Sequence, residues 1–462
     1  MAERMTMTFD LGKPGQARPR PDRASHILVV LGDFLGSGSE LPAPARPRRV
    51  EIETLDTLMA QWQPSIPRPG SSAPSATRIN FTRLDDFHPD NLVRELPEPA
   101  AAEASPESAQ HAEPLGLPPT ESDATHESDQ QTLSRLLGSQ PLGMSAADGS
   151  KTGHSRKQQS LIDSVVQKLT EKAALEAPAD QPGNRSSIED GLQADNLRRL
   201  LQDPGLRRLE ACWRSLDWLL RNNPLDTECP VYLLNFPAAG ETAEVDQGDA
   251  FDHAVDVLHQ QLSHLDPSEN RLILILDHCF KPTAEDITRL QRLGLLAQQL
   301  GAMLVSAADS LFSELQQDSE SGQSWANMRN QEISAHMMLS LPRLLLRLPY
   351  GNRYEPIEHF AFEEWTGPAD TEKLTWGNPA YALALILLCE WMDDRSFEER
   401  RFLDWPAFAY PDGDEMGFQP ATESLYTEQT LQTLLSLGLT PAIGSRRQNS
   451  VQFPWLQTLK NN

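Results

Sequence analysis

Cysteine is scarce in this chain, and the short motifs that accompany common catalytic and metal sites are missing. No two cysteines form a CxxC pair, and the sequence has neither a GxSxG nor an HExxH pattern. This excludes a disulfide framework and a zinc site, and we expect reduced thiols in a cytoplasmic protein. The only four cysteines among 462 residues are Cys212, Cys229, Cys279 and Cys389.

Long apolar runs and net positive charge are also lacking. The longest apolar stretch, YALALILLC at Tyr381–Cys389, is too short to span a bilayer, and MAERMTMTFD at the N-terminus lacks the apolar core of a signal peptide. The formal charge is −26, from 66 acidic and 40 basic residues. Such a surface repels phosphate backbones and anionic lipids, so we expect no nucleic acid and no membrane insertion, and basic protein partners are favoured.

Composition divides the chain into two folded regions and a linker. Residues 96–159 are rich in Pro, Ala, Ser, Glu and Gln, and no Lys or Arg occurs between Glu95 and Arg135. This stretch cannot bury enough apolar surface to offset the entropy of ordering it. We therefore predict a disordered acidic linker between a domain at 1–95 and a second folded region at 188–462.

Strand and helix patterns indicate an α/β fold. In the first region, HILVVLGDF reads as a strand, RRVEIETLDTLMAQW as a strand leading into a helix, and INFTRLDDFHPDNLVREL as a strand followed by a helix from Pro89. In the second region a helix pair broken at Pro204-Gly205 precedes alternating strands and helices, among them the strands CPVYLLNF, RLILILDHCF and AMLVSAAD. The pattern predicts two lobes with a mixed or parallel sheet flanked by helices.

Two polar segments of the first region have a possible chemical role and a structural one. The loop LGDFLGSGSE contains Gly32, Gly36 and Gly38 but lacks the lysine of a phosphate-binding loop, which favours a structural turn. LDDFHPD offers four possible metal ligands, but capping of the next helix accounts better for its acids. The four are Asp85, Asp86, His88 and Asp90.

The segment LILILDHCF ends in an acid, an imidazole and a thiol. Consecutive residues of a strand point to opposite faces, so His278 and Cys279 do not pair side by side within one. We expect the strand to end at Asp277, with His278 and Cys279 packing the turn that follows. We expect no catalytic residue, metal or cofactor in the chain.

Two arginines lie in LPRLLLRLPYG, ahead of the carboxylates of FAFEEW. Arg343 and Arg347 could bind an anion, but pairing with those carboxylates is favoured. In the following LTWGNPAYALALIL, Gly377-Asn378 reads as a turn and helix N-cap, with Pro379 as the first residue of a buried helix.

One amphipathic segment stands alone at 160–178. SLIDSVVQKLTEKA carries an apolar face after Ser160, a plausible N-cap. Two alternatives remain open, a helix that docks a partner and a helix packed permanently on the second domain. The face comprises Leu161, Ile162, Val165, Val166 and Leu169, continued by Ala173.

From about residue 160 to 460 the chain resembles the large subunit of the type VI secretion contractile sheath (TssC, VipB or ImpC). The resemblance lies in LLQDPGLRRLEACWRSLDWLL, LPRLLLRLPYG, FEEW, LTWGNPAYALA and LYTEQTLQTLLSLGLTPAIG, in the family's order. Residues 1–95 resemble the small subunit (TssB or VipA), through ILVVLGDFLG, RPRRVEIETLDTLMAQWQPSI and INFTRLDDFHPDNLV.

The resemblance implies a non-enzymatic structural or assembly protein of a type VI secretion system. Its expected partners are sheath subunits, baseplate or tube components, with self-association possible. The large subunit normally continues beyond the segment that ends here at Asn462, so we expect binding to a sheath or baseplate end rather than extension of the sheath. An alternative is a regulatory adaptor for the AAA+ unfoldase that recycles the sheath, or for the baseplate, with the 160–178 helix as its docking element.

Overall fold

The structure is a computed structural model that describes residues 25–36, 46–68, 78–96, 182–224, 228–236, 247–263, 270–392, 400–412 and 415–461. The described residues up to Leu96 and those from Asp190 onward belong to one compact unit, the first, and residues 182–189 belong to a second. Apart from Leu96, the predicted linker at 96–159 lies outside the described residues, as does the predicted helix at 160–178.

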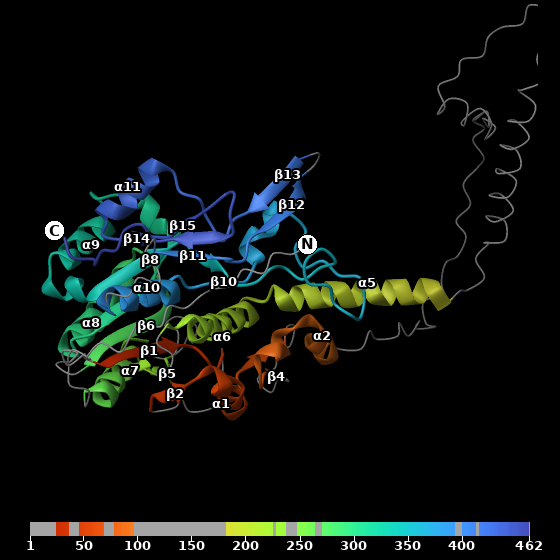
Figure 1. The fold of residues 1–462 in the computed structure, drawn as a ribbon, viewed down its shortest axis with the longest axis horizontal. Helices are drawn as coiled ribbons and strands as arrows, with labels where there is room; N and C mark the ends of the chain where they lie inside the picture. Colours follow the sequence, from red (N-terminus) through yellow and green to blue (C-terminus); the bar gives the residue numbers. More distant parts are fainter. Residues whose placement is uncertain are drawn as a thin grey trace, which may run out of the picture. The chain divides into compact units, whose positions relative to one another are not determined.

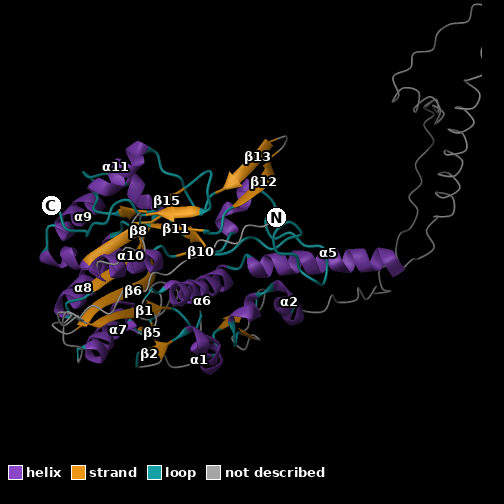
Figure 2. Ribbon diagram, viewed as in Figure 1, coloured by secondary structure: helices purple, strands orange, loops and turns teal. Residues whose placement is uncertain are grey.

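A seven-stranded sheet lies at the centre of the first unit (Figures 1 and 2). Its order is β14-β8-β7-β6-β1-β5-β2, and every neighbouring pair is parallel except β5 and β2. The prediction of a mixed or parallel sheet is therefore confirmed, in the form of a mixed sheet with mostly parallel pairs. The strands are β1 (Ser25–Gly32), β2 (Arg48–Val50), β5 (Val231–Asn235), β6 (Asn270–Phe280), β7 (Met303–Ala308), β8 (Met337–Leu341) and β14 (Thr440–Pro441).

Strand β1 lies between two strands that follow it by about two hundred residues or more. Leu28 pairs with Val231 of β5 on one side and with Ile273 of β6 on the other. A strand in this position is buried on both faces, which explains its uninterrupted apolar run. Two separate lobes are not confirmed, because the first and second regions share this sheet.

Side chains of the central strands alternate between two apolar clusters. Val30 and Ile275 belong to the cluster on one face of the sheet, while Val29 and Leu274 belong to the cluster on the other. We call these the first and second faces. Helices α1 (Leu55–Trp62), α5 (Pro182–Leu201), α6 (Pro204–Asn222) and α10 (Ala380–Met392) contribute to the first, and α7 (Gln247–Leu262), α8 (Ala284–Gln299), α9 (Glu320–Arg329) and α11 (Glu428–Ser436) to the second.

Helix starts agree with the sequence signals. The predicted break between α5 and α6 is confirmed, because α6 begins at Pro204 and Asp203 Oδ1 accepts the N–H groups of Gly205 and Leu206. The predicted cap of α10 is also confirmed, because Asn378 Oδ1 accepts the Ala380 N–H at 2.9 Å. Every residue of α10 from Ala380 to Cys389 is buried.

Shorter elements complete the described part. None of the described helices combines the length and apolar character that crossing a bilayer requires. The remaining described α-helix is α2 (Pro89–Leu92), beside several short 3-10 helices. The remaining described strands are β3 (Ser65–Pro67), β4 (Arg78–Asn80), β9 (Leu344–Leu345), β10 (Trp376–Gly377), β11 (Arg401–Leu403), β12 (Phe408–Asp412), β13 (Glu415–Gln419), β15 (Ile443–Gly444) and β16 (Ser450–Gln452).

Candidate functional site

The triplet Asp277, His278 and Cys279 lies inside β6, not in a turn after it. The expectation that the strand ends at Asp277 is wrong, because β6 continues to Phe280 after a register irregularity between Ile275 and Cys279. Ser306 Oγ of the neighbouring β7 lies 2.9 Å from the carbonyl oxygens of both Leu276 and His278. This side chain supports the irregular backbone and lets the strand continue.

Asp277 joins β6 to the start of α10. Its Oδ2 accepts the Tyr381 hydroxyl at 2.9 Å, and its Oδ1 accepts Asn378 Nδ2 at 3.3 Å. The same Asn378 Nδ2 donates to the carbonyl of His278 at 3.0 Å. Burial raises the pKa of Asp277, against the effect of these hydrogen bonds. The Asp277 carboxyl group therefore fixes the start of the buried helix α10 to strand β6.

Cys279 and His278 do not form a nucleophile and base pair. Burial raises the pKa of Cys279 to about 12, so the thiol is protonated at neutral pH. Burial lowers the pKa of His278, and its ring packs edge-on against Phe280 at 4.6 Å between centroids. These surroundings favour the structural interpretation over thiol catalysis.

The glycine loop and the acidic segment also have structural roles in the described residues. Gly36 has φ +83°, and a Cβ there would lie 2.4 Å from the Ser65 carbonyl oxygen, so the turn requires glycine. Gly38 lies outside the described residues. Asp86 Oδ2 accepts the backbone N–H groups of Thr82 and Arg83, at 2.7 and 3.1 Å. Asp86 thereby caps the short 3-10 helix Leu84–Phe87. The expectation that these acids cap the next helix is wrong, because the N-cap of α2 is His88.

Asp90 faces away from the other acids of its segment. Its Oδ1 accepts the Glu358 N–H at 3.0 Å and contacts His359 Nδ1 at 2.9 Å, which joins α2 to a loop of the second region. His88 Nδ1 accepts the Asp90 N–H at 3.3 Å and lies 3.4 Å from Asp90 Oδ2, so the structure brings these two of the four candidates together. Throughout the described ranges, no three His, Cys, Asp or Glu side chains converge as a metal site would require.

The two arginines of LPRLLLRLPYG have different partners. Arg347 pairs with Glu364 of FAFEEW, at 2.7 Å between Nη1 and Oε2, which confirms the predicted partner. Arg343 does not pair with that segment, and the expectation is wrong for it. Its guanidinium makes a two-point contact with Glu423, with Nε 2.9 Å from Oε2.

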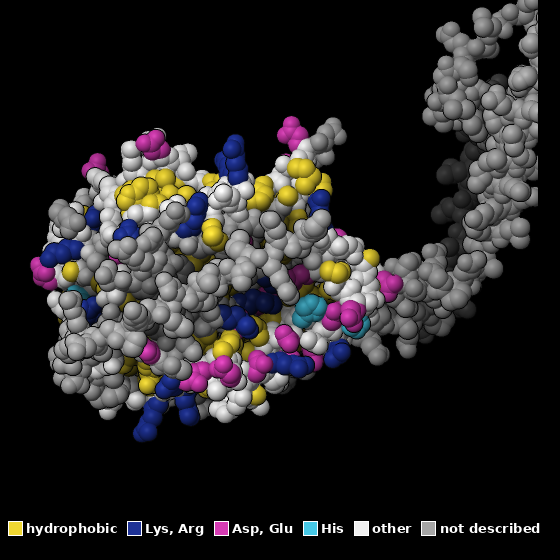
Figure 3. Space-filling model, viewed as in Figure 1, with side chains coloured by type: hydrophobic (Ala, Val, Ile, Leu, Met, Phe, Trp, Pro, Cys, Tyr) yellow, Lys and Arg dark blue, Asp and Glu magenta, His cyan; other side chains and the backbone are white. Residues whose placement is uncertain are grey.

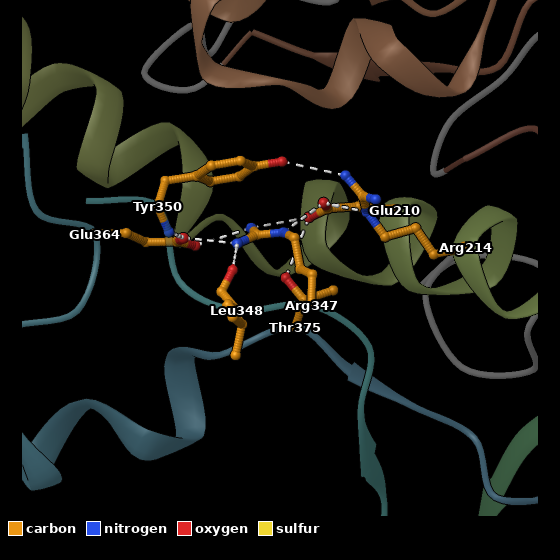
Figure 4. A network of polar contacts seen from close by, with 7 residues as sticks. All are labelled: Glu210, Arg214, Arg347, Leu348, Tyr350, Glu364 and Thr375. Carbon is orange, nitrogen blue, oxygen red and sulfur yellow. Dashed lines mark hydrogen bonds and ion pairs between the residues drawn. The ribbon is translucent and has the colours of Figure 1, made fainter. Parts of the chain in front are cut away.

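Arg347 is the centre of a buried polar network (Figure 4). Its Nε donates to Glu210 Oε1 at 2.7 Å, and its Nη2 contacts Glu210 Oε2 at 3.2 Å and Glu364 Oε1 at 2.9 Å. Its Nη1 donates to Glu364 Oε2 at 2.7 Å and to the Leu348 carbonyl at 3.1 Å. All five N–H donors of the guanidinium are therefore used.

Glu210 is the member that sequence reasoning missed. It is 1% exposed on α6 and also accepts Arg214 Nε at 2.7 Å and the Thr375 hydroxyl at 3.1 Å. Burial opposes its ionisation, yet the charges of Arg347 and Arg214 lower the pKa of Glu210 to about 2. The sequence did contain one indication of its role. Glu210 lies beside the apolar stripe of α6, one helical turn before Arg214.

The network fixes α6 against two distant segments of the chain. Glu364 also accepts the Tyr350 N–H at 2.8 Å, and Arg214 Nη2 donates to the Tyr350 hydroxyl at 3.1 Å. Charged groups that are paired and hydrogen-bonded in this way are suited to holding a conformation. The predicted docking residues Leu161, Ile162, Val165, Val166 and Leu169 lie outside the described residues.

Comparisons with known proteins concern the second region. A family model described as EvpB/VC_A0108, tail sheath N-terminal domain (VipB), matches residues 186–460, more than half of the chain. The chain is 26% identical over 248 residues to the type VI secretion system sheath protein TssC1 of Pseudomonas aeruginosa. The alignment covers 48% of this chain and 50% of that protein, so the chain spans about half the length of this curated relative.

Proposed function

The chain belongs to the VipB tail sheath N-terminal domain family, and on that premise we propose that it is a non-enzymatic structural component of a type VI secretion system. The family match across residues 186–460 carries the proposal. The chain acts in the cytoplasm through contacts with sheath, baseplate or tube components. The Glu210–Arg347 network and the Asp277 contacts support this role, because they hold elements together.

We also propose that residues 25–96 supply the part that a separate small sheath subunit would supply. The position of β1 between β5 and β6 supports this, since the segment completes a sheet made by the second region. Asn235 Oδ1 accepts the N–H groups of Phe34 and Leu35 at 2.8 and 3.2 Å, and Trp213 Nε1 donates to the Phe34 carbonyl at 3.1 Å.

Co-purification tests the first proposal. The tagged full chain is expressed in cells that carry the whole secretion apparatus, and the particle is characterised by mass spectrometry and electron microscopy. We expect sheath, baseplate or tube subunits in the particle. A soluble complex without any of them contradicts the proposal. For the second proposal, residues 1–96 and 190–462 are co-expressed as separate chains, which should co-purify; independent elution of the two contradicts it.

A regulatory adaptor is the second candidate function. The apolar face of Leu161, Ile162 and Val165, between stretches of linker composition, favours a helix that docks in the groove of an unfoldase or baseplate protein. Deleting Leu161–Leu175 should abolish unfoldase binding and leave sheath binding intact. If unfoldase binding survives the deletion, the docking helix is wrong.

A further inference from the structure

A pocket of about 760 Å³ lies where β1 and β6 end, beside the first turn of α6. After β1 the chain turns to the first face, where Phe34 and Leu35 pack in its cluster. After β6 it turns to the second face, where α8 begins at Ala284. Neighbouring parallel strands that exit to opposite faces leave a crevice at their carboxyl ends, and α/β proteins bind ligands at such positions.

Most of the charged side chains around this pocket are basic. Against a chain charge of −26, the pocket is lined by five cations and only three carboxyl groups. In Figure 3 a group of Lys and Arg side chains lies in a recess near the middle of the drawn face, where Figure 1 places the junction of α5 and α6. The cations are Arg207, Arg208, Lys281, Arg343 and Lys373, and the carboxyl groups are those of Asp33, Asp277 and Glu372.

Two of the cations form no ion pair within the part of the chain that the structure describes, although the charges of Asp203 and Glu364 act on one of them, Arg207. Arg343 pairs with Glu423, and Lys373 lies 2.7 Å from Asp370. Arg207 and Lys281 form no ion pair there. Arg207 Nη1 donates to a backbone carbonyl, that of Glu372, and its Nε is buried without a hydrogen-bond partner. This N–H group has lost its hydrogen bonds to water on burial, and no acceptor in the described protein compensates for that loss.

Among the described residues, two of the three acids of the pocket, Asp277 and Asp33, form no ion pair with Arg207 or Lys281. Asp277 already accepts hydrogen bonds from Tyr381 and Asn378, and Asp33 Oδ1 accepts the Gly36 N–H at 3.0 Å. Burial raises the pKa of both carboxyl groups, which disfavours their charged forms. His278, which also lines the pocket, has a buried Nε2 without a partner.

We propose that this pocket binds an organic phosphate, with Arg207 and Lys281 contacting the phosphate oxygens. Arginine presents a planar fork of donors to a phosphate and lysine a compact charge. The dipole of α6 adds positive potential, although its first N–H groups already donate to Asp203. The volume exceeds that of one phosphate group, and Leu209 and Trp376 offer apolar surface to an organic part. The ligand class is a phosphorylated small molecule of nucleotide size.

Isothermal titration calorimetry of the full chain at fixed ionic strength tests this, with inorganic phosphate, pyrophosphate and ADP as probes. We expect saturable binding of one ligand per chain, with ADP tighter than inorganic phosphate. Arg207→Gln and Lys281→Gln should each raise the Kd by about tenfold. Arg221→Gln, on α6 outside the pocket lining, is the control and should change the Kd by less than about twofold.

Three results would overturn the proposal in whole or in part. If none of the probes binds saturably, there is no anion site. If Lys281→Gln binds the probes as tightly as the unmodified chain does, the site lies elsewhere. This variant tests the site even if Arg207→Gln fails to fold, because Lys281 is exposed and its side chain makes no hydrogen bond or ion pair to a described residue. If ADP and pyrophosphate bind no tighter than inorganic phosphate, the pocket holds the anion alone and the organic ligand is wrong.

Discussion

Replacing Arg347 by methionine should destabilise the protein by about 3 kcal/mol. The change leaves Glu210 and Glu364 buried, at 1% and 3% exposure, without the guanidinium that makes four hydrogen bonds to them. Removing one partner of a buried ion pair costs roughly 3–5 kcal/mol. We expect the lower end of this range, because Arg214 still contacts Glu210 at 2.7 Å.

Urea unfolding at pH 7, followed by tryptophan fluorescence and far-UV circular dichroism, measures the effect. With a slope of roughly 3 kcal/mol per M urea for a folded unit of this size, the midpoint should fall by about 1 M. The matched control is Arg221→Met on the same helix, whose pair with Asp217 lies at the surface, with Arg221 63% exposed. Pairs of this kind contribute below about 1 kcal/mol, so its midpoint should move by less than about 0.3 M.

Equal midpoints for Arg347→Met and Arg221→Met would refute the reasoning, since burial would then have added nothing to the cost of losing the cation. A triple variant tests whether the two unpaired carboxylates cause the loss of stability. In the triple variant Arg347→Met, Glu210→Gln, Glu364→Gln the uncompensated charges are gone, so most of the lost stability should return. A triple variant that is less stable than Arg347→Met contradicts the assignment to buried carboxylates.

Three further predictions concern acid stability, thiol reactivity and one turn. Because the pKa of Glu210 is lowered to about 2, its ionisation contributes fully to the free energy of unfolding above the unfolded pKa of about 4.3, and this contribution is lost as the pH falls toward 2. Glu210→Gln should therefore remove up to about 3 kcal/mol of the pH dependence of stability. Urea unfolding from pH 6 to pH 2 measures this. A Cys279 pKa of about 12 predicts slow iodoacetamide alkylation at pH 8, monitored by mass spectrometry of peptides, and fast native alkylation would revive the nucleophile hypothesis. Gly36→Ala should destabilise the protein by about 1–3 kcal/mol, because the added Cβ would clash with the Ser65 carbonyl oxygen. Gly191→Ala, where the added Cβ has open space, should be neutral or stabilising. Similar thermal midpoints for the two variants would contradict this.

Local patterns predicted the elements well, and contacts over long sequence distances poorly. Period-two and period-3.6 repeats identified β1, β5, β6 and β7 and the break before α6, because they depend on neighbouring residues. The pair Arg347–Glu364 was found because 17 residues separate its members. Glu210 lies 137 residues from Arg347, and Glu423 lies 80 from Arg343, so only the tertiary fold brings them together.

The sheet order and the end of β6 were missed for related reasons. Nothing in HILVVLGDF specifies that β1 pairs with β5 and β6, because strand partners are chosen by the whole fold. The polar triplet at Asp277 resembles a strand end when it is read alone. It continues the strand because Ser306, on a different strand, supports the irregular backbone.

The central position of β1 also has a consequence for synthesis on the ribosome. β1 is translated well before its partners β5 and β6, and 201 residues separate Phe34, just after β1, from Asn235 at the end of β5. Until then a strongly apolar strand has both edges unpaired, which favours association with other chains. Folding of the sheet then requires closure of a long loop, so we expect slow, high-contact-order folding and a nascent chain that benefits from a chaperone bound to β1.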